Sequence, residues 1–313
     1  MASDILQEVT VDEIPRVLEA MKKDWPQHFL LHQFVSILEE YHKENIQNPK
    51  QVLYKYGDFE DGVYIVKSTF AIGAESVSLI YPYTTAADYT EFSKVLSETT
   101  RIPWTEKFMF EVTARRLMPT IQQVSAAKGC DLGTEEGATL FLPPESDIEN
   151  KLLPEDVYLG SLDEHHVAEV NENWPFKYPG SEKFVALQIQ NNFGLGLFRK
   201  SDNKMLSSSV SFHSGGIFIL YSNPNFRSRG YGEVIIREMA KEIRRQGRIP
   251  FGNIMTENIV STKLFNKMGF KEYYKSVYLF PKKLFNFAVL KHCKCCIKGL
   301  LHLILTTTHQ QLT

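Results

Sequence analysis

A short segment between a predicted strand and a predicted helix constrains the fold more than any other part of the sequence. It runs from Pro224 to Gly232 and follows the strand-like run 217–222. Within it, Arg227, Gly230 and Gly232 form an R-x-x-G-x-G pattern. Glycine lets a backbone approach a bulky anion closely, and the free N–H groups at the start of a helix attract negative charge. The segment therefore predicts a site for a pyrophosphate-sized anion, with an ordinary strand-to-helix turn as the alternative.

A second pattern lies in the next predicted strand–helix pair. It extends from Asn258 to Phe270 and reads N-x-x-S-x-x-L-F-x-x-x-G-F. A helix here would turn Leu264 and Phe265 toward a core, and Gly269 would end it as a left-handed cap. Each pattern alone is compatible with plain core packing. The two in this order, each after its expected strand, indicate one binding site.

Hydrophobic periodicity predicts a mixed α/β (α+β) chain in two lobes. The polar, proline-bearing stretch 143–154 is typical of a domain boundary. We expect a first lobe at 1–145, a second at 155–285 and a tail at 286–313. Helices are expected at 13–23, 28–43, 87–97, 114–127, 163–173, 181–190, 232–245 and 261–268. Strands are expected at 52–55, 62–66, 76–81, 138–142, 195–199, 206–212, 217–222, 252–255 and 271–280.

Composition narrows the class of protein. Hydrophobic residues make up 43% and charged residues 23%, which is typical of a soluble globular protein and excludes disorder. The formal net charge is -2, and no stripe of basic and aromatic residues accompanies Arg227 and Arg229, so no nucleic-acid partner is expected. The acidic first residues fit neither a secretory signal nor a transit peptide. The most hydrophobic window, 284–305, contains three lysines, so we expect a cytoplasmic protein without a membrane span.

The predicted tail carries its own chemistry. Residues 282–298 contain five lysines and no acid, with Cys293, Cys295 and Cys296 among them. A palmitoylated basic tail that touches a membrane is one interpretation, and a flexible extension is the other. Three crowded cysteines give poor tetrahedral geometry for zinc, so no metal is expected. The few cysteines favour a reducing compartment.

Together, these patterns resemble the GNAT superfamily of acyl-CoA-dependent N-acyltransferases. In that family the first pattern, 227–232, binds the pyrophosphate of coenzyme A, and the second, 258–270, lies beside the pantetheine arm. A third pattern from Leu162 to Phe176, L-D-x-x-H-x-x-x-V-N-x-x-W-x-F, resembles the glycine N-acyltransferase branch. That branch has two acetyltransferase-like lobes, and only the second has a working coenzyme loop. The resemblance covers 157–280 well and the first half weakly.

The resemblance implies tandem GNAT-like lobes, each a mixed, mostly antiparallel sheet flanked by helices. It implies acyl-CoA or acetyl-CoA as co-substrate, bound by the second lobe, whereas the first lobe is degenerate. The residues implied to contact coenzyme A are Leu220, Ser222, Arg227, Ser228, Arg229, Gly230, Tyr231, Gly232, Asn258, Ser261 and Phe265.

Two catalytic side chains of the family have no counterpart here. The glutamate base of the glycine-acylating relatives aligns with Gly216, and the tyrosine that protonates the thiolate aligns with Phe265. Candidate substitutes are His213, Tyr221 and Glu257, and water is a further proton relay. The plainer interpretations are a turn or surface histidine, a tyrosine turned away by strand alternation, and a glutamate that caps a helix.

The sequence thus predicts an N-acyltransferase that acts on a small amine or amino acid such as glycine. The alternatives are an N-acetyltransferase for a protein or arylalkylamine acceptor, and a coenzyme A-binding module without catalysis.

Overall fold

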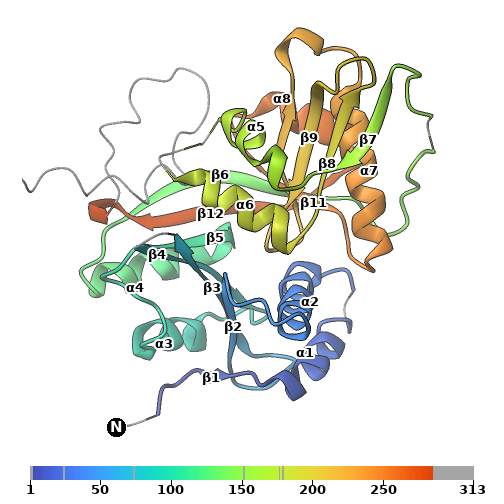
Figure 1. The fold of residues 1–313 in the computed structure, drawn as a ribbon. Coiled ribbons are helices and arrows are strands. Elements are labelled where there is room, and N and C mark those ends of the chain that lie inside the picture. The colour runs from blue at the N-terminus through green and yellow to red at the C-terminus, as the bar shows by residue number, and fades with distance from the viewer. Residues whose placement is uncertain are drawn as a thin grey trace, which may run out of the picture. The chain divides into compact units, whose positions relative to one another are not determined.

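The computed structural model describes residues 3–23, 25–72, 75–150, 152–175, 177 and 180–284, which form two compact units (Figure 1). Unit 1 contains the described residues up to Gly137 and those from Tyr274 onward, and unit 2 contains Ala138–Tyr273. The expected tail, with Cys293, Cys295 and Cys296, lies outside the described residues. Among the described residues, each helix is too short or too polar to cross a bilayer.

Unit 1 is built on one sheet with the strand order β1-β2-β3-β4-β5-β12-β6. Its strands β4 and β5 are parallel, and its remaining reported pairs are antiparallel. Helices α3 and α4 bury Phe92, Leu96 and Ile121 in a core with the sheet. The elements are β1 (Gln7–Glu8), α1 (Ile14–Ala20), α2 (Phe29–Lys43), β2 (Lys50–Tyr56), β3 (Val63–Ile72), β4 (Glu75–Thr84), α3 (Thr90–Glu98), β5 (Phe108–Ala114), α4 (Met118–Ala127), β6 (Leu132–Phe141) and β12 (Lys271–Pro281).

Unit 2 contains an antiparallel sheet of four strands in the order β10-β9-β8-β7. Helix α7 buries Ile235, Met239 and Ile243 at four-residue spacing and packs on β8, β9 and β10. Helix α6 packs against β9 from the other face (Figure 1). The elements are β7 (Val157–Ser161), α5 (Val167–Glu172), α6 (Ser181–Asn191), β8 (Gly194–Arg199), β9 (Met205–Ser211), β10 (Ile217–Ser222), α7 (Tyr231–Arg245), β11 (Phe251–Met255) and α8 (Ile259–Lys267).

Strands β6 and β12 each pass from one unit into the other, because the division falls after Gly137 and after Tyr273. In unit 1, β12 is the antiparallel partner of β5, with Val277 opposite Thr113. In unit 2, the end of β6 lies beside β11. Unit 1 therefore obtains a strand from a part of the chain distant in sequence.

The stretch 143–154, expected as a boundary, lies inside unit 2. The Arg244 guanidinium of α7 donates hydrogen bonds to the carbonyl oxygens of Pro143 at 2.8 Å and Ser146 at 2.5 Å. These bonds hold the stretch against the helix.

The predicted fold class, lobes of mixed and mostly antiparallel sheet flanked by helices, is confirmed. Strand β10 has the predicted bounds, Ile217–Ser222. Strand β5 was not predicted: every residue of Phe108–Ala114 is buried, including Glu111, so the run lacks the alternation that marks a half-exposed strand.

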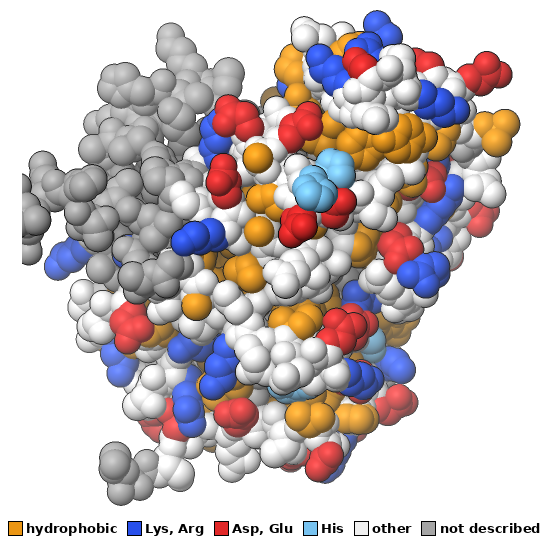
Figure 2. All heavy atoms as spheres, in the orientation of Figure 1, with side chains coloured by type: hydrophobic (Ala, Val, Ile, Leu, Met, Phe, Trp, Pro, Cys, Tyr) orange, Lys and Arg blue, Asp and Glu red, His pale blue; other side chains and the backbone are white. Residues whose placement is uncertain are grey.

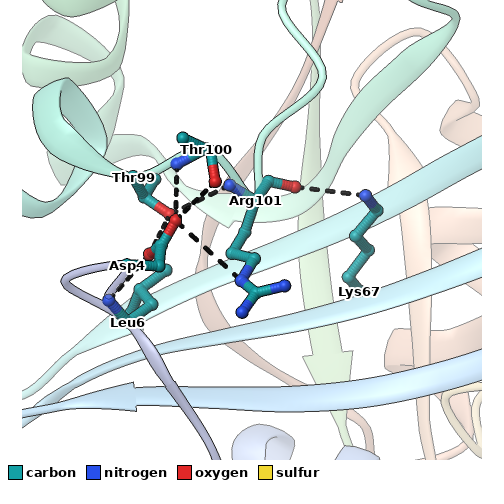
Figure 3. A network of polar contacts seen from close by, with 6 residues as sticks. All are labelled: Asp4, Leu6, Lys67, Thr99, Thr100 and Arg101. Atoms are coloured by element: carbon teal, nitrogen blue, oxygen red, sulfur yellow. Dashed lines mark hydrogen bonds and ion pairs between the residues drawn. The ribbon is translucent and has the colours of Figure 1, made fainter. Parts of the chain in front are cut away.

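The start of unit 1 is held by one carboxylate, that of Asp4 (Figure 3). It accepts hydrogen bonds from the backbone N–H groups of Leu6 and Thr100, both at 2.8 Å, and from the Thr99 and Thr100 hydroxyls at 2.9 and 2.6 Å. Arg101 Nε lies 3.9 Å away. Burial alone would raise the pKa of Asp4, but the hydrogen bonds from these neighbours outweigh it, and the pKa lies below its usual value.

Candidate active site

Strand β10 is irregular in its middle. Phe218 pairs with Val210 and Tyr221 with Ser208, so two residues of β10, Ile219 and Leu220, stand opposite one residue of β9. This arrangement is a β-bulge. Ile219 has a φ of 49°, a left-handed conformation that β-branched residues rarely adopt and that costs about 1–2 kcal/mol. Surrounding contacts must hold such strain, which concentrates at functional sites.

A mostly apolar cleft of about 150 Å³ lies beside this bulge. Residues 217–220 of β10 line it on one side and 252–255 of β11 on the other. Trp174, Pro175 and the beginning of α8 complete the lining. The cleft is therefore open along the bulged segment of β10.

Aromatic rings shape the walls of the cleft. Trp174 stacks on Phe184 with ring centres 5.9 Å apart and meets the edge of Phe218 at 5.8 Å. Phe265 of α8 lies against Gly252, where a Cβ atom would stand 2.7 Å from its ring. Trp174 thus belongs both to the core and to the cleft.

The loop between β10 and α7 has the geometry of an anion site. Gly230 precedes the helix with a φ of 78°, and a Cβ atom there would meet nothing within 4 Å. A Cβ atom at Gly232 would lie 3.2 Å from both Leu264 and the Ser222 hydroxyl. The first glycine therefore supplies a left-handed turn, whereas the second allows close packing. The N–H groups of the first turn of α7 lack helical partners and suit an anion.

Positive charge gathers at the same end of unit 2. Three cations surround the Phe226 ring: Arg199 at 5.1 Å, Arg229 at 5.3 Å and Lys204 at 5.7 Å from its centre. Figure 2 shows Lys and Arg side chains over the ends of β8, β9 and β10, with a few acids between them. Asp202 accepts hydrogen bonds from Arg199, which lower its pKa to about 2. The field at the loop favours a polyanion.

The second sequence pattern forms the first turn of α8. Asn258 Oδ1 accepts a hydrogen bond from the Ser261 N–H at 3.1 Å, which is an N-cap, and the Thr262 hydroxyl donates to the Asn258 carbonyl at 3.1 Å. Asn258, Ser261 and the neighbouring Glu257 all line the cleft. The cap thus fixes the helix end that closes the cleft.

The structure separates the candidate catalytic residues. Glu257 lines the cleft, whereas His213 and Tyr221 do not. His213 is fully buried in the turn between β9 and β10, where its N–H donates to Gln188 Oε1 at 2.9 Å. Burial, and then the negative charge of Glu169, raise the pKa of Tyr221.

The implied coenzyme contacts fall into two groups. Leu220, Asn258, Ser261 and Phe265 line the cleft. Ser222 and the segment 227–232 form the loop at the start of α7, where Arg227, Ser228 and Arg229 are exposed and Tyr231 is buried.

The polar residues of the third pattern form hydrogen bonds that stabilise helix ends and helix packing. His166 Nδ1 lies 2.7 Å from Asp163 in a capping box, and the Ser181 hydroxyl donates to Asn171 Oδ1 at 2.6 Å. Phe176 lies outside the described residues.

Asn253 is a polar cleft residue that the sequence did not reveal. It lies on β11, and the Thr139 hydroxyl of β6 donates to its Oδ1 at 2.8 Å. No local pattern marks this pair, because the two residues come from distant strands.

Known proteins share this architecture. Residues 194–279 match the family model described as FR47-like protein. A GCN5-related N-acetyltransferase from Sphaerobacter thermophilus superposes over 88% of this chain and 94% of its own, with a TM-score of 0.55 at 10% identity. The chain has the GNAT fold. A tandem GNAT protein from the clavulanic acid biosynthesis pathway matches over 89% and 97% of the two chains, with a TM-score of 0.50 at 9% identity.

The GNAT fold extends over both units. A Drosophila protein matches 89% of this chain and 99% of its own, with a TM-score of 0.78 at 18% identity. No curated protein shows a significant sequence match. The predicted resemblance to the GNAT superfamily is thus supported at the level of the fold, and the glycine N-acyltransferase branch stays a prediction. Among the described residues, His, Cys, Asp and Glu side chains form no group suited to a metal ion.

Proposed function

We propose that this chain transfers an acyl group from acyl-CoA to the amine of a small acceptor, such as glycine, another amino acid or a small amine. One observation carries the proposal. An apolar cleft lies beside the strained bulge of β10, and the same strand leads into the loop at the start of α7, which suits an anion. An acyl-CoA requires both features, because its thioester end is apolar and its pyrophosphate is an anion.

The loop residues fit the pyrophosphate. The backbone at Gly230 is open, and the first N–H groups of α7 supply hydrogen-bond donors. The exposed side chains of Arg227, Ser228 and Arg229 add charge and a hydroxyl. The pantetheine arm would then run between Leu220 and Ser222 on β10 and Asn258, Ser261 and Phe265 on α8.

In the reaction, the acceptor nitrogen forms a bond to the thioester carbonyl carbon and the carbon–sulfur bond breaks. The nitrogen loses a proton and the leaving thiolate gains one. In this proposal the backbone N–H of Leu220, which lines the cleft at the bulge, stabilises the oxyanion. We assign proton removal to Glu257, directly or through water, because among the described residues it is the one carboxylate that lines the cleft.

The other two candidate bases are less well placed. The raised pKa of Tyr221 keeps its phenol protonated at neutral pH, so it is not a base there. His213 lies in the core behind the β9–β10 turn. A role for either would require movement of the turn or strand.

A coenzyme A-binding module without catalysis is the second candidate. It is favoured by Phe265, which places an apolar ring where the family has a tyrosine, and by the absence of room for a side chain at Gly216. The alternative acceptors, a protein amino group or an arylalkylamine, would use the same donor site.

Thiol release from acetyl-CoA over a panel of acceptors tests the proposal. The panel contains glycine, other amino acids, an arylalkylamine and a peptide with a free amino terminus. We expect release with a small amino acid or amine, and at least a tenfold lower kcat in Glu257→Gln, since general-base catalysis contributes about 10²–10⁴-fold. The matched control is Glu155→Gln, an exposed glutamate before β7 that does not line this cleft. Binding without release for any acceptor would favour the non-catalytic module.

A further inference from the structure

Two serine hydroxyls of β9 meet the bulge of β10 from the neighbouring strand. Ser209 Oγ donates to the carbonyl oxygen of Phe218 at 2.8 Å, and Ser207 Oγ donates to that of Tyr221 at 2.5 Å. These two carbonyls flank the extra residues of the bulge. Both serines are fully buried.

The bulge explains why hydroxyls are needed there. In a regular antiparallel pair, the carbonyls that face the partner strand accept hydrogen bonds from its N–H groups. A bulge disrupts that ladder, and a buried carbonyl without a donor is costly. Serine supplies the donor from its side chain, and its rotating O–H adapts to the displaced carbonyl.

Ser207 also connects the bulge to the anion-binding loop. Its hydroxyl lies 3.0 Å from that of Ser222, the last residue of β10. The same Ser222 hydroxyl limits the space at Gly232. A single chain of contacts thus runs from β9 through the bulge to the start of α7.

We propose that Ser207 and Ser209 are positioning residues for acyl transfer, which hold Ile219 in its left-handed conformation and thereby keep the backbone of Ile219 and Leu220 at the cleft. This inference rests on the proposed function. The serines act through the backbone of β10 and do not contact the reacting atoms.

The chain contains its own control, Ser208. It lies between the two serines, is equally buried, and faces the other side of the sheet because side chains alternate along a strand. Its hydroxyl has no hydrogen-bond partner among the described residues. Removal of this hydroxyl therefore measures the effect of losing a buried serine hydroxyl from β9 without removing a hydrogen bond to the bulge.

Steady-state kinetics of the full-length variants S207A, S208A and S209A test the proposal. A reacting group misplaced by about 1 Å can cost 10²-fold. We therefore expect kcat to fall at least about tenfold in S209A and S207A. The dissociation constant for acetyl-CoA should stay within about twofold in S209A, and S208A should match the wild type in both kcat and the dissociation constant. S209T keeps the hydroxyl and should restore most of the rate. Equal rates in S208A and S209A would overturn the proposal.

A second measurement does not depend on activity. In protein labelled with ¹⁵N-isoleucine and ¹⁵N-leucine, the amide resonances of Ile219 and Leu220 should move in S209A and stay in place in S208A. If the wild type transfers no acyl group, the proposed function fails, and these resonances still decide whether the hydroxyls hold the bulge. Unmoved resonances in S209A would overturn that part.

Discussion

At the scale of single residues, Gly216 shows why the usual glutamate base is absent. A Cβ atom at this position would lie 2.8 Å from the ring of Phe251, which is fully buried. Gly216 does not have a positive φ, so its restriction is one of space rather than of backbone conformation. The ring of Phe251 occupies the volume that a larger side chain would need.

We therefore predict that Gly216→Ala lowers the free energy of unfolding by about 1–3 kcal/mol, the usual cost of overpacking. Gly216→Glu should cost more and should not raise acyl transfer. Denaturant unfolding measures both. The control is Phe251→Leu, in whose background Gly216→Ala should cost less, because the smaller side chain leaves room. An unchanged cost in that background would show that the ring is not the obstacle.

The sequence singled out several residues by local patterns, and their role in binding coenzyme A stays a prediction. Gly230 and Gly232 were predicted from their spacing after a strand, and Asn258 and Ser261 from theirs before a helix. Phe251 and Thr139 were not foreseen as neighbours of Gly216 and Asn253, because contacts between distant strands leave no local pattern.

At the scale of elements, the sequence predicted strand β10 but not its bulge, and it did not predict strand β5. The bounds of β10 follow from its apolar run and flanking turns, and the structure agrees. Its bulge is a shift of register against β9, whose serine hydroxyls donate to the carbonyl groups on either side of it, so sequence periodicity does not show it. Strand β5 is buried on both faces and carries Glu111, and therefore lacks the alternation on which the prediction depends.

The beginning of unit 1 provides a pH-dependent prediction. The pKa of Asp4 is lowered in the folded state, so its stabilising contribution is present above the unfolded value near 3.9 and is lost as the pH falls through the folded value. We expect Asp4→Asn to lower the free energy of unfolding by about 1–3 kcal/mol at pH 7, because it removes the charge from the acceptor of four hydrogen bonds. The difference should shrink below about pH 4.

Thermal unfolding of wild type and Asp4→Asn between pH 7 and pH 3 measures this effect. The control is Asp12→Asn, at an exposed position of the same segment. A constant difference across the pH range would contradict the assignment of the effect to the Asp4 carboxylate.

At the scale of the whole molecule, the two lobes were predicted but the course of the strands between the two units was not. Strand β6 ends in unit 2 and β12 ends in unit 1, so unit 1 combines two separate segments of the described chain. The polar stretch 143–154 has the composition of a linker, yet Arg244 binds its carbonyl groups within unit 2. The composition of a stretch indicates whether it is exposed to solvent. It does not indicate which strands pair, because pairing joins residues that are distant in sequence.

We predict that a fragment of residues 155–285 does not fold cooperatively. It lacks Thr139 and the carbonyl groups bound by Arg244, and it leaves the second part of β12 without its partner β5. An unpaired strand edge promotes aggregation. Circular dichroism and thermal unfolding of the fragment and the full chain give the comparison. A cooperative transition of the fragment at the temperature of the full chain would contradict the prediction.

The central claim is that the start of α7 binds the pyrophosphate of an acyl-CoA. Calorimetric titration of the full-length protein with acetyl-CoA tests it most directly, beside Gly230→Glu and the control Gly247→Glu. Both glycines have a left-handed φ, 78° and 74°, with open space around them, but Gly247 lies past the other end of α7. A carboxylate about 4 Å from a phosphate charge costs about 4 kcal/mol at an effective dielectric constant of 20, so we predict binding to the wild type and the control and at least tenfold weaker binding to Gly230→Glu. No binding to the folded wild type, or equal binding to both variants, would contradict the account.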